Sequence, residues 1–254
     1  MTVVGLLHPG EMGSAVGAAL AGRGETVLWA SAGRSLATME RAQRFGLEDA
    51  GNVAELCRRS EIVLSVCPPH AAVDVAEAAR DFEGIYVDAN AISPETARRI
   101  GGLRSRFVDG GIIGPPPLEA GTTRLYLSGR EAGAVAELFS GTSVDTRVIS
   151  DEPGAASALK MAFAGWTKGS AALLLAVRAL ARAEGVEETL LAEWQLSLPE
   201  LEEQSVAAEH SAGNKGWRWV GEMEEIAGSM DSQGLPAGFH EAAAEIFRRL
   251  SAGS

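Results

Sequence analysis

The chain has 254 residues, of which 46% are hydrophobic and 22% charged, proportions typical of a globular protein with a large core. Its formal net charge of −12 disfavours binding to nucleic acid or to anionic membranes, which are themselves negatively charged. No apolar run reaches the roughly 18 residues of a membrane span. The two cysteines, Cys57 and Cys67, form neither a disulfide framework nor a metal-binding pattern, so we expect a cytoplasmic protein without a metal site.

The first expected element is a strand at Val3–Leu7, followed by a glycine-containing turn and an Ala-rich helix at Ser14–Ala21. This order is typical of dinucleotide-binding folds, because the free backbone N–H groups at a helix N-terminus bind a pyrophosphate. The turn reads His8-Pro9-Gly10-Glu11-Met12-Gly13 and keeps the second and third glycines of the G-x-G-x-x-G fingerprint. His8 stands where the first glycine is normally found.

Each residue of this turn has an expected role. Gly10 permits close approach of the phosphate, Gly13 lets the helix pack on the strand, and Pro9 keeps the turn rigid by fixing φ. His8 is expected to contact a phosphate or to shape the turn. The predicted cofactor contacts in this segment are His8, Pro9, Gly10, Glu11 and Met12.

The second expected strand, Thr26–Trp29, determines which nicotinamide cofactor is predicted. An NAD site usually has an Asp or Glu at the end of this strand, where it binds the ribose 2′-hydroxyl. Here Ser31 and Arg34 follow the strand and no acid is present, a set that suits a 2′-phosphate. We therefore predict NADP(H); the plain alternative is an ordinary polar loop with a surface arginine.

Short β-rich runs alternate with helical runs through the first 150 residues, as in a parallel α/β sheet. The expected strands are Val3–Leu7, Thr26–Trp29, Ile62–Val66, Ile85–Asp88, Phe107–Asp109, Arg124–Ser128 and Arg147–Ile149. The expected helices are Ser14–Ala21, Ser35–Arg44, Val53–Arg59, Ala71–Arg80, Pro94–Ile100 and Ala132–Leu138. We assign residues 1–152 to a Rossmann-type α/β domain that binds NADP(H).

The pattern changes after Asp151–Gly154, where a long stretch rich in Ala, Leu and Met runs to about Glu184. No strand pattern follows. Further helices are expected at Glu188–Trp194, Glu200–Ala208 and Phe239–Leu250, with breaks at Asn214–Gly216, Gly228 and Gly234–Pro236. Residues 153–254 therefore form an all-α domain. Its long helix is too apolar to face water on many sides, so it is either central in its own domain or buried against a second subunit. A helical region of about 100 residues after a Rossmann domain favours the second, and we expect a homodimer formed through this domain.

Loops that follow strands supply the candidate chemistry, because open α/β sheets bind ligands at the carboxyl ends of their strands. Cys67 and Pro68 follow one strand and are predicted to bind cofactor, as is Asn90 after the next. The stretch Gly111-Ile112-Ile113 lies in a third such loop and is predicted to contact a small-molecule substrate. The plain alternative for any one loop is that it only caps its strand.

Lys160 is the candidate catalytic residue. The chain has only three lysines against 19 arginines, so a lysine in an apolar helical stretch stands out. An ammonium in such surroundings must be paired, must reach solvent or must have a function, and lysine serves in proton transfer. Lys168 is expected to be structural. His240, near the start of the last helix, is a candidate for lining the substrate pocket of a neighbouring subunit.

Taken in order, these motifs resemble those of the β-hydroxyacid dehydrogenases, a family that includes 3-hydroxyisobutyrate and 6-phosphogluconate dehydrogenases and, as a branch, the imine reductases. The opening Val4–Gly13 is similar to I-G-F-I-G-L-G-x-M-G, and Asp88–Pro94 is similar to D-x-S-T-V-S-P. Asp109–Pro115 resembles the substrate loop, and Gly154–Lys160 the segment of the catalytic lysine. The resemblance implies a Rossmann domain, a helical dimerisation domain and Lys160 as general acid or base, with Asn90 orienting it or the substrate.

Departures from the family pattern concern the substrate. Ile113 stands at the serine of the carboxylate-binding loop, Asn90 replaces a serine, and Ala164 stands where an asparagine follows the lysine. We therefore expect a substrate that is less anionic than a small hydroxy acid.

Three functions remain open from the sequence. The first is an NADP(H)-dependent oxidoreductase acting on a carbonyl or alcohol carbon. The second is an imine reductase, because Asp109–Ile113 resembles the D-G-A-I-M loop of those enzymes, although they generally lack the lysine. The third is a catalytically degenerate NADP(H)-binding protein.

Overall fold

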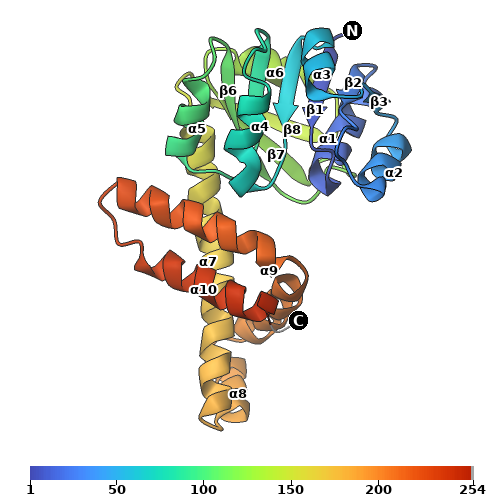
Figure 1. The fold of residues 1–254 in the computed structure, drawn as a ribbon. Coiled ribbons are helices and arrows are strands. Elements are labelled where there is room, and N and C mark those ends of the chain that lie inside the picture. Colours follow the sequence, from blue (N-terminus) through green and yellow to red (C-terminus); the bar gives the residue numbers. More distant parts are fainter. Residues whose placement is uncertain (253–254) are drawn as a thin grey trace. The chain divides into compact units, whose positions relative to one another are not determined.

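The computed structural model describes residues 1–252, apart from the side chains of Lys215 and Ala252. The chain divides into two compact units, Met1–Lys160 and Met161–Ser254. A mostly parallel sheet with helices is followed by an all-helical region, so the expected fold class is confirmed (Figure 1). Among the described residues, no helix is both long and apolar enough to span a membrane.

The first unit is built on an eight-stranded sheet in the order β3-β2-β1-β4-β5-β6-β7-β8. Its strands are β1 (Val3–Leu7), β2 (Thr26–Trp29), β3 (Glu48–Asp49), β4 (Ile62–Ser65), β5 (Ile85–Asp88), β6 (Phe107–Ile113), β7 (Thr123–Ser128) and β8 (Val144–Ser150). All neighbouring strands are parallel except β6 and β7. The order of the first six strands is that of dinucleotide-binding sheets, whose direction of winding reverses between β1 and β4.

Helices cover both faces of this sheet. They are α1 (Glu11–Gly22), α2 (Leu36–Arg44), α3 (Val53–Arg59), α4 (Ala72–Ala78), α5 (Pro94–Gly101) and α6 (Ala132–Leu138), with a short 3₁₀ turn η1 (Pro69–Ala71). Two separate apolar cores result: one joins α1 and α6 to the sheet, and the other joins α3, α4 and α5 to it. Successive residues of a strand belong to different cores, as Ile85 and Tyr86 of β5 do, because side chains alternate between the faces.

The register of the parallel strands fixes one edge of the sheet. Leu7 pairs with Ser65, Ser65 with Asp88 and Asp88 with Asp109, so β1, β4 and β5 all end at the same level. Strand β6 continues past this level to Ile113, where the sequence predicted a loop from Gly110 onward. That prediction was wrong because β6 gains antiparallel hydrogen bonds from β7, a partner that local composition does not reveal.

The second unit consists of helices. The 29-residue helix α7 (Ala155–Ala183) begins in the first unit and continues into the second, where α8 (Glu187–Ser197), α9 (Glu200–Ser232) and α10 (Gly238–Ala252) follow. Helices α9 and α10 pack along each other, with the ring centroids of Trp219 and Phe247 5.1 Å apart (Figure 1).

Helix α9 corrects a sequence prediction. It runs unbroken for 33 residues through Asn214–Gly216 and Gly228, where breaks were expected. An internal glycine costs a helix only about 1 kcal/mol, which tertiary packing readily offsets. The Asn214 side chain also donates to the carbonyl of His210 one turn earlier. The expected break at Gly234–Pro236, between α9 and α10, is present.

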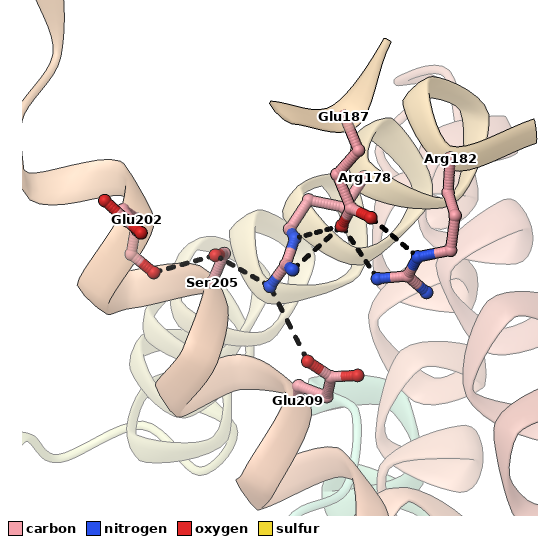
Figure 2. Close-up of polar contacts among 6 residues, drawn as sticks. All are labelled: Arg178, Arg182, Glu187, Glu202, Ser205 and Glu209. Carbon is pink, nitrogen blue, oxygen red and sulfur yellow. Dashed lines mark hydrogen bonds and ion pairs between the residues drawn. The ribbon is translucent and has the colours of Figure 1, made fainter. Parts of the chain in front are cut away.

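A group of charged side chains joins α7, α8 and α9 (Figure 2). Arg178 and Arg182 of α7 both donate to Glu187 of α8, and Arg178 also reaches Ser205 and Glu209 of α9. Hydrogen bonds from Arg182 and Arg178 lower the pKa of Glu187 to about 2. Two arginines and two glutamates balance in charge, and the contacts connect three helices of this unit.

Candidate functional site

The predicted cofactor residues meet at the carboxyl edge of the sheet. His8 follows β1, Ser31 and Arg34 follow β2, Cys67 and Pro68 follow β4, and Asn90 follows β5. Strands β1 and β4 are neighbours at the point where the winding reverses, and the crevice outside that point is the usual ligand site of such sheets. The structure thus brings together predicted residues from loops that are far apart along the chain.

The turn after β1 contains a residue with a left-handed backbone conformation. His8 has φ of 65°, and it is the one non-glycine residue among those described whose φ is positive. This left-handed conformation explains why a glycine is usual at this position. A Cβ on Gly13 would lie 2.6 Å from the His8 carbonyl oxygen, so Gly13 is required for α1 to approach the turn.

The N-terminus of α1 is open toward the edge of the sheet. Gly10 is its N-cap residue and supplies no side-chain cap, whereas Ser35, Asn52 and Ser93 cap α2, α3 and α5. A Cβ on Gly10 would have no heavy atom within 4 Å. Glu11 and Met12 are the first residues of the helix. The first N–H groups of α1 are therefore available to an anion.

Arg34 lies beside this turn. Its Nη2 is 3.4 Å from Nδ1 of His8, and within the described part of the chain its buried Nε has no hydrogen-bond partner. Burial, and then the charge of Arg34, lower the pKa of His8 to about 4, so the imidazole is neutral near pH 7. Burial also lowers the pKa of Arg34. A second arginine, Arg41 of α2, donates to the carbonyl of Pro9 at 3.4 Å.

Asn90 ties the loops of β4 and β5 together. Its Oδ1 accepts from the backbone N–H of Cys67 at 2.5 Å, and its Nδ2 donates to Ser65 and Asp88 at 3.0 Å each. Burial raises the pKa of Asp88 to about 7, with a further contribution from Asp109. Burial and Asp88 raise the pKa of Cys67 to about 12, so its thiol stays protonated. Asn90 thus joins the loops after β4 and β5, and its roles in cofactor binding and in orienting Lys160 or the substrate stay predictions.

Asp109, at the level where β5 ends, caps helix α7. Its Oδ2 accepts from the backbone N–H groups of Gly154 and Ser157, at 2.9 and 3.0 Å, and from Oγ of Ser128 at 2.9 Å. Its Oδ1 accepts from Oγ of Ser157 at 2.5 Å. Oγ of Ser128 in turn accepts from the N–H of Ala156 at 3.1 Å. A carboxylate at a helix N-terminus satisfies otherwise free donors and interacts favourably with the helix dipole.

This cap positions Lys160. Lys160 lies on α7 just after the capped turn, and its Nζ donates to the carbonyl oxygen of Ile112 at 2.8 Å. A Cβ on Gly111 would lie 2.7 Å from the Ala156 carbonyl oxygen and 3.1 Å from Cβ of Lys160, so only glycine lets α7 approach β6 so closely. Ile112 and Ile113 are buried residues of β6 beyond the level where β5 ends. Lys160 and the loops that carry the predicted cofactor residues therefore lie at the same edge of the sheet.

The remaining predicted residues lie in the second unit. Ala164 is buried on α7, and His240 is buried near the start of α10. A Cβ on Gly165 would lie 3.3 Å from Nε2 of His240, which places the imidazole directly on α7. Lys168 forms an ion pair with Glu222, and both side chains are largely buried, which agrees with its expected structural role.

The sequence does not predict the residues that position the site. It indicates a loop at Asp109 and not a helix cap, and it assigns no role to Ser128, Ser157 or Arg41. Gly154 and Ser157 do not form a capping box, so no local pattern points to Asp109 as the cap. Within residues 1–252, no group of three or more His, Cys, Asp or Glu is placed to hold a metal ion.

The Asp109 cap predicts a large effect of Asp109→Asn. The substitution replaces a charged acceptor by an amide with a single accepting atom, leaving buried donors poorly satisfied. We expect the free energy of unfolding to fall by about 1–3 kcal/mol, measured by urea unfolding. The control is Asp145→Asn, which removes an exposed ion pair with Arg147 and should cost less than about 1 kcal/mol. Equal stability of the two variants would contradict the capping role.

Comparison with known protein families gives one match, to a family described as a domain of unknown function (DUF1932), at residues 181–250. Among curated proteins, the chain is 34% identical over 164 residues to an uncharacterized 28.5 kDa protein from Methanothermus fervidus. That match covers 63% of each chain, so this chain spans less than two thirds of the relative's length.

Solved structures match over nearly the whole chain. MTH1747, a conserved protein of unknown function reported as similar to 3-hydroxyacid dehydrogenases, is 29% identical with a TM-score of 0.72, over 98% of this chain and 97% of its own. The Mycobacterium tuberculosis 3-hydroxyisobutyrate dehydrogenase is 18% identical with a TM-score of 0.70, over 99% and 94% of the two chains.

Reductases also share the fold. A Streptomyces aurantiacus imine reductase is 22% identical with a TM-score of 0.57, over 97% of this chain and 93% of its own. An Aspergillus terreus reductive aminase in complex with NADPH is 20% identical with a TM-score of 0.60, over 100% and 95% of the two chains. The resemblance seen in the sequence motifs is confirmed: the chain has the fold of the hydroxyacid dehydrogenases and imine reductases.

Proposed function

We propose that the protein is an NADP(H)-dependent oxidoreductase that transfers a hydride between the nicotinamide and a carbonyl or alcohol carbon. One observation carries the proposal. The open turn after β1 and the Lys160 ammonium on the Ile112 carbonyl lie at the same edge of one sheet, within one compact unit. The dehydrogenases and reductases that share the fold support oxidoreduction as the general class.

The residues at this edge fit a phosphorylated nicotinamide cofactor. The uncapped N-terminus of α1 at Gly10 offers backbone donors to a pyrophosphate. The buried Nε of Arg34 has no hydrogen-bond partner among the residues that the structure describes, and such a donor suits an additional anionic group such as the ribose 2′-phosphate. Ser31 is half-buried after β2, and its hydroxyl donates a hydrogen bond to the Gly51 carbonyl oxygen at 3.4 Å. The reductive aminase complex with NADPH is consistent with this choice over NAD.

Lys160 is proposed as the proton donor in the reductive direction. NADPH, when bound, supplies the hydride. The Lys160 ammonium gives a proton to the oxygen that becomes an alcohol, and in the oxidative direction the neutral amine takes it back. The Ile112 carbonyl can accept an N–H from either form, so Nζ stays in place through the cycle. The Asp109 cap holds the helix turn on which Lys160 lies.

The proposed substrate is an apolar carbonyl compound. The stretch Gly111–Ile113 offers aliphatic side chains and backbone where a carboxylate-binding serine is expected in the family, and Ala164 replaces an asparagine. Together with His240, these residues are our candidate substrate contacts. Preference for short alcohols bearing a carboxylate, in a turnover panel, would argue against this choice.

An imine reductase is the second candidate, favoured by the Asp109–Ile113 sequence and by the reductases that share the fold. An iminium nitrogen already carries its proton before the hydride arrives, so C=N reduction does not need Lys160 as an acid. The two functions therefore differ in their dependence on this lysine.

The proposal predicts that Lys160→Met lowers kcat for ketone reduction by about 10²–10⁴-fold, because a general acid contributes that much to the rate. The affinity for NADPH, measured by its fluorescence on binding, should remain within about twofold of the original. Cyclic imine reduction that survives the substitution, without ketone reduction in the wild type, would favour the second candidate. Tight NADPH binding with no turnover on a broad panel would indicate the catalytically degenerate alternative.

We also propose a homodimer formed through the helical unit. A groove of about 850 Å³ lies between α7 and α9 and is lined by Trp166, Leu173 and Phe239, whose exposed fractions are 76%, 51% and 49%. Large apolar side chains gathered on one surface usually mark an interface. A second copy of the chain would cover them.

Trp166→Asp tests this dimer, because it places a charge at the centre of the exposed apolar surface. We expect a dimer for the wild type and a monomer for the variant in sedimentation velocity at the same micromolar concentration. The matched control is Leu118→Asp, which changes an equally exposed residue outside the groove and should remain dimeric. A monomeric wild type would contradict the proposal.

A further inference from the structure

His8 departs from the glycine of the dinucleotide-binding turn but keeps the glycine backbone. Its φ of 65° is a conformation that a residue with a side chain adopts only at an energetic cost. A glycine would adopt the same backbone freely, so the imidazole must offer something that offsets the strain. Strained residues of this kind are found preferentially at functional sites.

The imidazole has one defined partner at the edge of the sheet. Nδ1 of His8 is 3.4 Å from Nη2 of Arg34, and an arginine can only donate, so Nδ1 accepts and the ring proton is on Nε2. Burial and the adjacent guanidinium keep the ring neutral near pH 7, since they lower its pKa to about 4. A protonated ring would lose the acceptor and repel Arg34.

Among the titratable groups of the neighbouring elements, Arg34 is the one that contacts the His8 ring. From α2, Arg41 contacts the Pro9 carbonyl and not the ring. From the loop after β4, the Cys67 thiol is protonated because burial raises its pKa to about 12. One end of the Arg34 guanidinium contacts His8, while among the described residues its buried Nε has no hydrogen-bond partner and is a donor that a bound anion could satisfy.

We propose that His8 is the residue that sets cofactor specificity, because its neutral imidazole holds the Arg34 guanidinium in position for the 2′-phosphate of NADP(H). This inference rests on the proposed function, specifically on the choice of NADP(H). His8 acts through Arg34, so it is a positioning residue and does not itself bind the phosphate. With a glycine at this position, the Arg34 side chain would be mobile before binding. Cofactor binding would then have to order this side chain, at a cost in conformational entropy.

The test compares the affinities for NADP⁺ and NAD⁺, which differ only in the 2′-phosphate, by isothermal titration calorimetry of the full chain. For His8→Gly we expect NADP⁺ to bind about 3- to 10-fold more weakly, the loss typical of one hydrogen bond, and NAD⁺ to bind within about twofold of wild type. The melting temperature should stay equal or rise, because glycine relieves the backbone strain. An unchanged preference for NADP⁺ in a folded His8→Gly variant would overturn the inference.

His8→Asn serves as the rescue variant. Asparagine tolerates a positive φ, and its Oδ1 occupies the place of Nδ1 as an acceptor for Arg34, so the preference for NADP⁺ should be largely retained. In the double variant His8→Gly with Arg34→Ala, the preference should equal that of Arg34→Ala alone, because both changes remove the same contact. Additive losses would mean that His8 acts independently of Arg34 and would overturn the proposal.

A pH series separates this role from direct phosphate binding. Between pH 7 and pH 5, the ratio of wild-type to His8→Asn affinity for NADP⁺ should stay constant or fall, because protonation of His8 removes the acceptor. A ratio that rises toward low pH would show an imidazolium on the phosphate and would overturn the proposal.

The two proposals fail in different ways. If the wild type does not prefer NADP⁺ over NAD⁺, the proposed cofactor is wrong. If the wild type prefers NADP⁺ and the His8→Gly variant keeps that preference, only the inference about His8 is wrong.

Discussion

The carboxylate of Asp109 is the contact on which the candidate site depends. It accepts hydrogen bonds from the first turn of α7 and joins that turn to β6 and to Ser128 of β7. Because Gly111 lets the helix approach the strand closely, the cap fixes both the position and the rotation of α7. Lys160 lies on the next turn and reaches the Ile112 carbonyl of the same strand. The lysine is thus held by the same strand that carries the cap, and not by a mobile loop.

The opposite side of the edge is organised by a different constraint, the positive φ of His8. The fingerprint turn keeps Gly10 and Gly13, and their roles follow from the open N-terminus of α1 and from the close approach to the His8 carbonyl. His8 stands where the fingerprint has its first glycine, its backbone has the left-handed conformation that a glycine adopts freely, and its side chain contacts Arg34. The turn therefore carries a side chain beside Arg34 that a glycine would lack.

Local patterns in the sequence were sufficient for much of the fold. Strands such as β1 and β5, the start of α7 and the loops that follow β1, β2, β4 and β5 were predictable, because strand runs and turn residues are local signals. The extension of β6 through Gly110–Ile113 was not, since it depends on pairing with β7. Likewise α9 continues through Gly216, where the missing side chain admits Ser251 of α10.

Long-range polar contacts could not be predicted from the sequence either, because they depend on segments that are far apart along the chain. Asp109 caps a helix by accepting from Gly154, which lies 45 residues later in the sequence, and no periodicity links the two segments. The identity of Lys160 as a candidate followed from the rarity of lysine in this chain and from the family motif, but its contact with Ile112 followed only from the structure.

The central claim is that Lys160 and the cofactor turn serve one reaction at one edge of the sheet. A crystal structure of the protein with bound NADP⁺ tests it most directly. The account predicts that the pyrophosphate lies on the N-terminus of α1, and that the nicotinamide C4 and Nζ of Lys160 line the same cavity, with the Ile112 hydrogen bond retained. A nicotinamide separated from Lys160 by protein atoms, in an otherwise ordered complex, would contradict it.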